Sequence, residues 1–394
     1  MNKGMNYGKG YKNEILQLLH ICGVIPYRSL RLLSANHRMY QRAVKDMEKA
    51  GIVIVDKRGG EKNVRLRNHR WRRGEYENFI PETYMRYYEQ TAVGAVSDLS
   101  GGSKNKTTPG RILKNSATQI MMYACGIEIS PDKRDLRSDM LEDNDLAYYN
   151  SNEIKQIESY HDKVTHEKGD GEYSKKLINS RINGVLISPG GVYAIYNIGN
   201  ALIEWKRFGE VKMATYISGL IRHKSISDVS FNEPREAIVI AQNDSLYTKI
   251  LQGNYNKHSK VILMNIDYAY DRLYAVPESR DGICMLKMME VNGWRGKILD
   301  SIIPKEEQLA KNEVTVECDG YDISTGRYKL VFCIPNLQKL KAFVTRAELA
   351  AERDKFHIYC FSYQTKLITD VAGTNVVILK IDIEKFYNEY FVKA

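Results

Sequence analysis

The sequence lacks the marks of a metal-stabilised, secreted or membrane-bound protein. Its 394 residues include six cysteines, and no two of them form a Cys-x-x-Cys pair, so we expect reduced, buried thiols instead of a zinc knuckle or a disulfide framework. No stretch approaches the ~20 apolar residues of a membrane span, and residues 1–11 hold no apolar signal-peptide core. We therefore expect a protein of the cytoplasm that makes no contact with a membrane.

Motifs of common nucleotide-dependent and hydrolytic enzymes are also missing. The sequence has no G-x-x-x-x-G-K-[ST] phosphate loop, no G-x-S-x-G nucleophile elbow, and no His-hydrophobe-His cluster of the kind that nicking relaxases use. Because these motifs carry the chemistry of ATPases and hydrolases, neither class has support here. We expect no catalytic activity and no cofactor, apart from the Mg²⁺ alternative considered below.

Positive charge is concentrated at the N-terminal end. Residues 1–75 hold 17 of the 58 Lys and Arg residues and 6 of the 48 Asp and Glu residues, which leaves 41 bases and 42 acids for the rest of the chain. Lys and Arg neutralise the phosphates of nucleic acids. Phosphate charge does not distinguish DNA from RNA, but the order of elements described next favours double-stranded DNA.

The basic segment has the pattern of a helix-turn-helix. An amphipathic helix is predicted over Asn13–Cys22, a second short helix over Tyr27–Leu33, and a third over His37–Ala50, with Gly51 directly after its end. The apolar face of the third helix consists of Tyr40, Ala43, Val44 and Met47, and the opposite face carries a basic stripe of Arg38, Arg42, Lys45 and Lys49, with Gln41 beside it.

A β-hairpin follows the third helix. The runs Ile52–Lys57 and Asn63–Arg67 have strand character and are joined by residues 58–62, whose Gly59-Gly60 centre suits a tight turn. Helices followed by a hairpin predict a winged helix-turn-helix. A basic stripe alone can be an ordinary solvated face, and a winged helix can also bind protein, but the two features together favour DNA binding.

Different roles are expected for the basic residues. Side chains near the start of a recognition helix reach base edges, so Arg38, Gln41 and Arg42 are the candidates for reading sequence. Phosphate contacts position the protein without reading sequence, and the candidates for them are Lys45, Lys49, Arg58 and Lys62. A further cluster that could bind a backbone phosphate or enter a minor groove consists of Arg65, Arg67, Arg70, Arg72 and Arg73.

The rest of the chain is expected to belong to the α/β class, α+β overall. Residues 1–75 form the winged helix-turn-helix, residues 76–174 a helical connector with a flexible loop over 97–110, and residues 175–394 a mixed-sheet α/β domain. The helix predicted in the connector covers Arg111–Gly126. In the last domain, the predicted strands are Gly184–Ser188, Val192–Ile198, Leu202–Lys206, Ala237–Ala241, Val261–Ile266, Arg272–Val276, Lys329–Ile334, His357–Phe361 and Val376–Ile381, and the predicted helices are Glu210–His223, Ser245–Gly253, Leu337–Ala351 and Ile383–Phe391.

Glu204 and Lys206 are the only residues with a catalytic pattern. On a strand they would point to the same face, in the E-x-K arrangement with which restriction-endonuclease-like nucleases hold Mg²⁺ beside a lysine. Such a site needs a second acid from the preceding strands, yet residues 182–201 contain no Asp or Glu. A Mg²⁺-dependent nuclease is therefore an alternative, and a Glu–Lys pair on an exposed strand face is the favoured interpretation. Glu210, at the start of a predicted helix, simply suits the helix dipole.

The chain resembles the plasmid replication-relaxation proteins of Gram-positive mobile elements. The resemblance rests on the winged helix, the connector and the block SRINGVLISPGGVYAIYNIGNALIEWKRFGEVKMATYISGLI over residues 180–221. It implies an N-terminal DNA-binding domain joined to a restriction-endonuclease-like α/β domain, with Arg38, Gln41 and Arg42 at the recognition-helix positions. Because the acid before Glu204 is missing, the resemblance implies a degenerate nuclease domain.

Three functions follow from these observations. The first is sequence-specific binding of double-stranded DNA in replication, copy control or transfer of a plasmid or conjugative element. The α/β domain would then serve homodimerisation or contacts with other replication or transfer proteins, and a dimer would suit a repeated or palindromic site. The alternatives are the Mg²⁺-dependent nuclease and a transcriptional regulator whose α/β domain senses a ligand.

Overall fold

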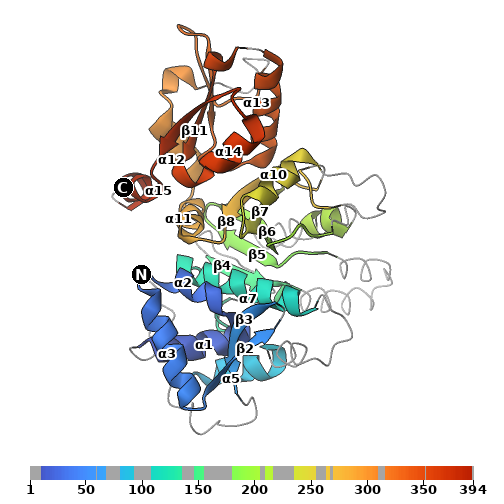
Figure 1. Ribbon diagram of the computed structural model, residues 1–394, viewed down its shortest axis with the longest axis vertical. Coiled ribbons are helices and arrows are strands. Elements are labelled where there is room, and N and C mark those ends of the chain that lie inside the picture. The colour runs from blue at the N-terminus through green and yellow to red at the C-terminus, as the bar shows by residue number, and fades with distance from the viewer. Residues whose placement is uncertain are drawn as a thin grey trace. The chain divides into compact units, whose positions relative to one another are not determined.

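The chain is a mixed α/β protein whose contacts divide it into two compact units (Figure 1). The first unit is Met1–Asp139, Leu146–Gly171 and Asn183–Leu186, and the second is Met140–Asp145, Glu172–Ile182 and Ile187–Ala394. The expected domain boundaries near 75 and 174 fall outside the described residues. The computed structural model describes residues 10–58, 60–67, 80–92, 108–134, 146–154, 180–204, 209–215, 235–253, 263–266, 269–308, 316–350 and 352–392.

The helices of the first unit agree with the sequence pattern. α1 (Tyr11–Cys22) buries its predicted stripe, and a 3-10 turn (Tyr27–Ser29) leads into α2 (Leu30–Leu33). α3 covers His37–Lys49, α5 covers Glu82–Tyr87 and continues as a π-type turn over Tyr88–Ala92, and α7 covers Thr108–Cys125. The loop predicted over 97–110 is therefore wrong at residues 108–110, which begin α7, because Pro109 suits the first turn of a helix. None of the described helices is long and apolar enough to span a bilayer.

A small antiparallel sheet completes the first unit's basic segment. β2 (Val53–Arg58) and β3 (Glu61–Leu66) form the predicted hairpin, with Val55 opposite Val64 and Lys57 opposite Lys62. Gly60 has a φ of 88°, which suits the turn between them. A strand that the sequence did not indicate, β1 (Val24–Pro26), pairs with β3, so the order is β1-β3-β2.

α7 belongs to the packing of this unit. It lies beside β1 and α2, where Leu113 packs on Val24 and the Ser116 hydroxyl donates a hydrogen bond to the Cys22 carbonyl at 3.2 Å. Also in the first unit, the Tyr148 hydroxyl of β4 (Ala147–Asn150) donates to the carbonyl of Asn183, directly before β5 (Gly184–Ser188). The helix predicted over 111–126 is therefore part of the first unit's core.

The second unit contains a parallel sheet. β6 (Gly191–Gly199), β7 (Glu236–Ala241) and β8 (Arg272–Pro277) are parallel neighbours, and α10 (Ser245–Gln252) lies in the connection from β7 to β8. Every residue of β7 is buried, as expected for a parallel strand whose two faces are both covered. These strands confirm the predicted positions to within about two residues.

A further sheet has the order β12-β11-β10-β9. β10 (Arg327–Val331), β11 (Phe356–Phe361) and β12 (Val377–Ile381) are parallel, and β9 (Gly320–Asp322) is antiparallel to β10. Two helices connect the parallel strands, α13 (Leu337–Ala350) and α14 (Thr365–Ala372). The remaining helices are α11 (Arg280–Met289), α12 (Trp294–Ile302) and α15 (Ile383–Tyr387) with a π-type turn over Asn388–Val392, and 3-10 turns cover Lys305–Glu307, Arg353–Lys355 and Ser362–Gln364.

Two predicted strands are wrong in their described parts. Of Leu202–Lys206 and Val261–Ile266, the structure contains only an isolated antiparallel bridge between Glu204 and Leu263. The apolar residues that suggested these strands lie in irregular chain. Met264 donates its backbone N–H to the Ile203 carbonyl at 3.0 Å, but no regular ladder follows in the described residues. The helix predicted from Glu210 is described over 209–215.

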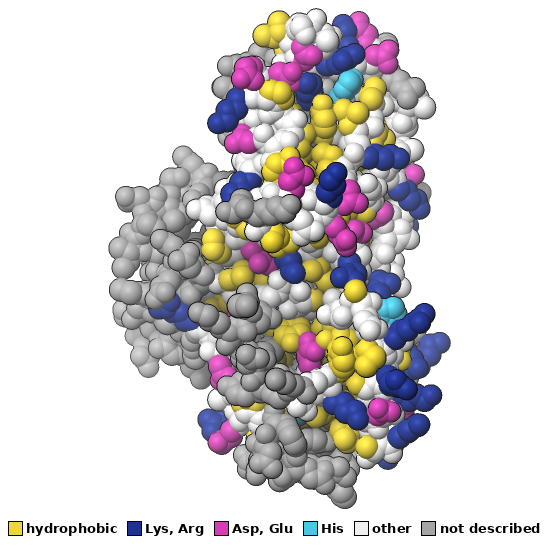
Figure 2. All heavy atoms as spheres, turned by 90° about the vertical axis from the view of Figure 1, so that its left-hand side faces the viewer, with side chains coloured by type: hydrophobic (Ala, Val, Ile, Leu, Met, Phe, Trp, Pro, Cys, Tyr) yellow, Lys and Arg dark blue, Asp and Glu magenta, His cyan; other side chains and the backbone are white. Residues whose placement is uncertain are grey.

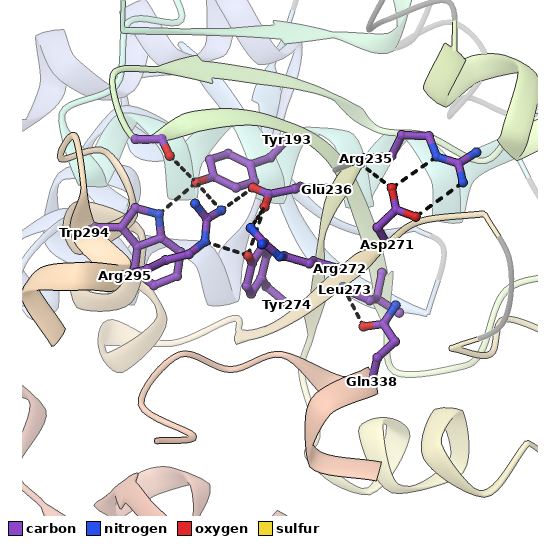
Figure 3. A network of polar contacts seen from close by, with 11 residues as sticks. Tyr193, Arg235, Glu236, Asp271, Arg272, Leu273, Tyr274, Trp294, Arg295 and Gln338 are labelled. Atoms are coloured by element: carbon purple, nitrogen blue, oxygen red, sulfur yellow. Dashed lines mark hydrogen bonds and ion pairs between the residues drawn. The ribbon is translucent and has the colours of Figure 1, made fainter. Parts of the chain in front are cut away.

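A buried carboxylate ties the start of β7 to its neighbours (Figure 3). Glu236, whose side chain is 7% exposed, accepts hydrogen bonds from Arg272 at 2.7 Å, from the Tyr274 hydroxyl at 3.2 Å, and from Arg295 of α12. Arg295 also donates from Nε to the Tyr274 hydroxyl at 2.9 Å and lies over the Trp294 ring, 4.8 Å from its centroid. We call these five residues the Glu236 cluster; they join β7, β8 and α12.

Candidate nucleic-acid interface

α3 presents two different faces, as its sequence predicts. The buried residues are Tyr40, Ala43, Val44 and Met47. The apolar face of α3 therefore packs against the rest of the first unit, where α1, α2 and β2 are its neighbours. Gly51 has a φ of 74° and lets the chain turn from the helix into the hairpin. The exposed side chains of the opposite face are Arg38, Arg42, Lys45 and Lys49, and Gln41 is half-buried.

α1 and α7 hold α3 through a shared carboxylate. Glu14 of α1 accepts hydrogen bonds from the Tyr40 hydroxyl of α3 at 2.6 Å and from the Tyr123 hydroxyl of α7 at 2.8 Å. Burial, together with the adjacent Glu14 carboxylate, raises the pKa of both tyrosines well above its usual value. Both hydroxyls therefore stay protonated and act as donors, which fixes the orientation of α3.

A groove of about 680 Å³ lies between α3 and the hairpin β2–β3. Its walls come from α3, from the hairpin, and from the 3-10 turn before α2. The lining residues are Tyr27, Arg38, Met39, Gln41, Arg42, Val44, Lys45, Glu48, Val55 and Lys62. Five residues predicted to bind DNA, namely Arg38, Gln41, Arg42, Lys45 and Lys62, are thus brought together in one concavity.

The hairpin wall is fixed to the 3-10 turn by two adjacent contacts. The Lys62 ammonium lies over the Tyr27 ring, 4.4 Å from its centroid, in cation–π geometry. Arg28 forms an ion pair with Glu61. Because successive residues of each segment contact successive residues of the other, Lys62 is held at the groove instead of being free to swing into solvent.

The groove is predominantly positive. Among its lining residues, Arg38, Arg42, Lys45 and Lys62 are cationic and Glu48 is anionic. Figure 2 shows dark-blue Lys and Arg side chains gathered on one side of the first unit. Such a surface attracts phosphates, and releasing the counterions of a nucleic acid makes binding weaken as salt rises.

Other predicted DNA-binding residues lie outside the groove. Arg65 points to the hairpin face opposite Lys62, because side chains alternate along a strand, and its guanidinium bonds the Asp56 carboxylate at 2.9 and 3.0 Å. Arg67 is exposed just after β3, Arg58 ends β2, and Lys49 lies on α3 beyond the groove. Arg70, Arg72 and Arg73 lie outside the described residues.

The pair considered for nuclease chemistry has an ordinary setting in its described half. Glu204 Oε2 is 3.5 Å from Arg181 Nη2, and both side chains are about two-fifths exposed, at 41% and 37%. Lys206 lies outside the described residues. Within the described ranges, no three His, Cys, Asp or Glu side chains come close enough together to hold a metal ion.

Sequence reasoning missed the environment of Glu210. Its carboxylate is fully buried in the second unit and accepts hydrogen bonds from the Tyr196 hydroxyl at 2.5 Å, the Ser180 hydroxyl at 2.7 Å and the Arg181 backbone N–H at 2.8 Å. Burial raises the pKa of Glu210, and these donors oppose the rise. The Glu210 carboxylate therefore joins its own helix to β6 and to the chain before β5. An acid at the start of a helix gave no indication of these long-range bonds.

Two groove residues were also missed, Tyr27 and Glu48. Each had a sequence signal: Tyr27 begins the second helix directly after Pro26, and Glu48 lies one helical turn after Lys45.

Comparison with known proteins adds no relative: no protein-family model matches the chain, and no match was found among curated proteins or solved structures.

Proposed function

We propose that this chain binds double-stranded DNA in a sequence-specific manner through a winged helix in its first unit. The element order supports this proposal, since three helices lead into the hairpin β2–β3, with α3 as recognition helix and the hairpin as wing. The observation that carries the proposal is the groove between α3 and the hairpin, because it gathers side chains chosen from the sequence for DNA contact.

The residues of the groove fall into two proposed roles. Arg38, Gln41 and Arg42 lie in the first half of α3 and are the candidates for base edges, where Arg pairs with guanine and Gln with adenine. Lys45 and Lys62 are the candidates for phosphates. Lys62 is oriented by Tyr27 before any ligand arrives, which lowers the entropy lost on binding.

We place this DNA binding in replication, copy control or transfer of a plasmid or conjugative element. That role rests on the resemblance noted from the sequence. The second unit would supply homodimerisation or contacts with replication and transfer proteins, and a two-fold dimer would offer two recognition helices to a palindromic or repeated site.

The proposal is tested by selecting bound sequences from a random duplex library with the full-length protein. A defined motif should emerge for the wild type. Arg42→Ala should relax the motif at one position, whereas Lys62→Ala should weaken binding to all sequences by a similar factor. Motif symmetry reports whether a dimer binds, and the absence of any enriched motif would contradict sequence-specific recognition.

A further inference from the structure

Glu48 is the anionic residue among those that line the groove. Its Oε1 accepts a hydrogen bond from the backbone N–H of Val55 at 3.3 Å, so the carboxylate is held against the hairpin instead of turning out to solvent. A fixed negative charge in a groove that should attract phosphates would repel the expected ligand. The position of this charge along the groove suggests what it does.

The negative charge lies toward one end of the groove. Glu48 follows Arg38 by ten residues, about 15 Å along a helix, and Val55 marks the same inner end on the hairpin. Lys62 pairs with Lys57, two residues beyond Val55 and about 7 Å closer to the hairpin turn. Glu48 therefore places the negative charge of the groove at its inner end, Lys45 lies one helical turn further out, and Arg38 and Lys62 lie at the outer end.

We propose that Glu48 excludes the DNA backbone from the inner end of the groove and confines phosphates to the outer end. This inference rests on the proposed function and deepens it. A phosphate next to Glu48 would meet a like charge at short range, where screening is weakest. DNA without the target sequence binds through phosphates alone, so this repulsion lowers non-specific affinity most and makes Glu48 a specificity-determining residue.

The test compares Glu48→Gln with Glu82→Gln in the full-length protein. Glutamine at position 48 keeps an oxygen that can accept from the Val55 N–H and removes only the charge. Glu82 is an exposed residue of α5, paired with Arg86 and outside the groove lining, so its variant changes net charge equally. Binding of a fluorescent random-sequence duplex of about 20 base pairs is followed by anisotropy at several KCl concentrations, with the measurable salt slope as readout.

Glu48→Gln should bind the random duplex about threefold to tenfold more tightly, and its log–log salt slope should steepen by about 0.9, the value of one more phosphate contact. Glu82→Gln should match the wild type. If Glu48→Gln is unstable, Glu48→Ala should show the same increase in affinity for the random duplex. Equal behaviour of the two Gln variants, or weaker binding by Glu48→Gln, overturns this inference alone. If the wild type does not bind the duplex, or Lys62→Ala binds it as tightly as the wild type does, the proposed function itself fails.

Discussion

Replacing Glu236 by Gln should destabilise the second unit. The substitution keeps the size of the side chain and an acceptor oxygen but removes the charge that Arg272 and Arg295 share. Both guanidinium groups would then face a neutral amide, and an amide nitrogen would compete for the position that accepts from Tyr274. The result is a site with two uncompensated cations.

The magnitude follows from burial. Removing one partner of a fully buried ion pair costs about 3–5 kcal/mol. Here the carboxylate is 7% exposed, but the arginines are 34% and 30% exposed, and water can solvate them in part. We therefore expect a loss of about 2–3 kcal/mol, which corresponds to a fall of about 1 M in the urea midpoint.

Trp294 provides the assay, because its ring is fully buried, contacts Arg295 and donates Nε1–H to the Tyr193 hydroxyl at 3.0 Å. Urea unfolding is followed by tryptophan fluorescence in a background with Trp71 and Trp205 replaced by Phe, so that only the second unit is reported. The control is Asp271→Asn, which removes the charge of the more exposed ion pair with Arg235 at the same end of β7 and β8. This change should cost less than about 1 kcal/mol. Equal midpoint shifts for the two variants would refute the reasoning.

Three further perturbations test other parts of the account. Burial raises the pKa of Glu290 to about 8 from 4.5, so between these values the unfolded state releases its proton first and stability falls by up to about 1.4 kcal/mol per pH unit. Glu290→Gln should remove this fall, so the urea midpoints of the variant and the wild type should differ by different amounts at pH 5 and at pH 8. The same difference at both pH values would contradict this prediction. Gly190→Ala should prevent folding or cost more than about 3 kcal/mol, because the new Cβ would overlap the Met289 carbonyl oxygen, and thermal melting should show Gly296→Ala, with open space around it, at or above wild-type stability. Tyr40→Phe removes the hydrogen bond to Glu14 and should cost about 1–2 kcal/mol in thermal unfolding followed by circular dichroism; an unchanged melting temperature would show that α3 does not depend on that bond.

Local patterns predicted much of the fold because they act over a few residues. The period of α3 identified its buried Tyr40, Ala43, Val44 and Met47 correctly, and short apolar runs located β6, β7, β8 and β11. The hairpin was also predictable, since two strand-like runs flank a pair of glycines. These signals depend on alternation and turn chemistry, which the sequence displays directly.

Features made by distant residues were not predictable. β1 is three residues long and exists because β3 pairs with it. α11 was missed for a different reason, since Met285, Leu286 and Met289 do have helical spacing within it. Glu236, Arg272 and Arg295 meet only after β7, β8 and α12 have packed. For the same reason, the basic stripe indicated which α3 residues to consider but could not indicate that Lys62 and Glu48 share their groove.

Two charge-matched variants test whether the groove between α3 and the hairpin binds DNA. One replaces Arg38, Arg42, Lys45 and Lys62 by Gln, and the other replaces four exposed cations of the second unit, Lys249, Arg346, Lys366 and Lys385, by Gln. Equilibrium binding of a random duplex at about 0.1 M KCl should weaken by at least about a hundredfold in the groove variant and by far less in the other. Equal weakening in both variants, or none in the groove variant, would contradict the account.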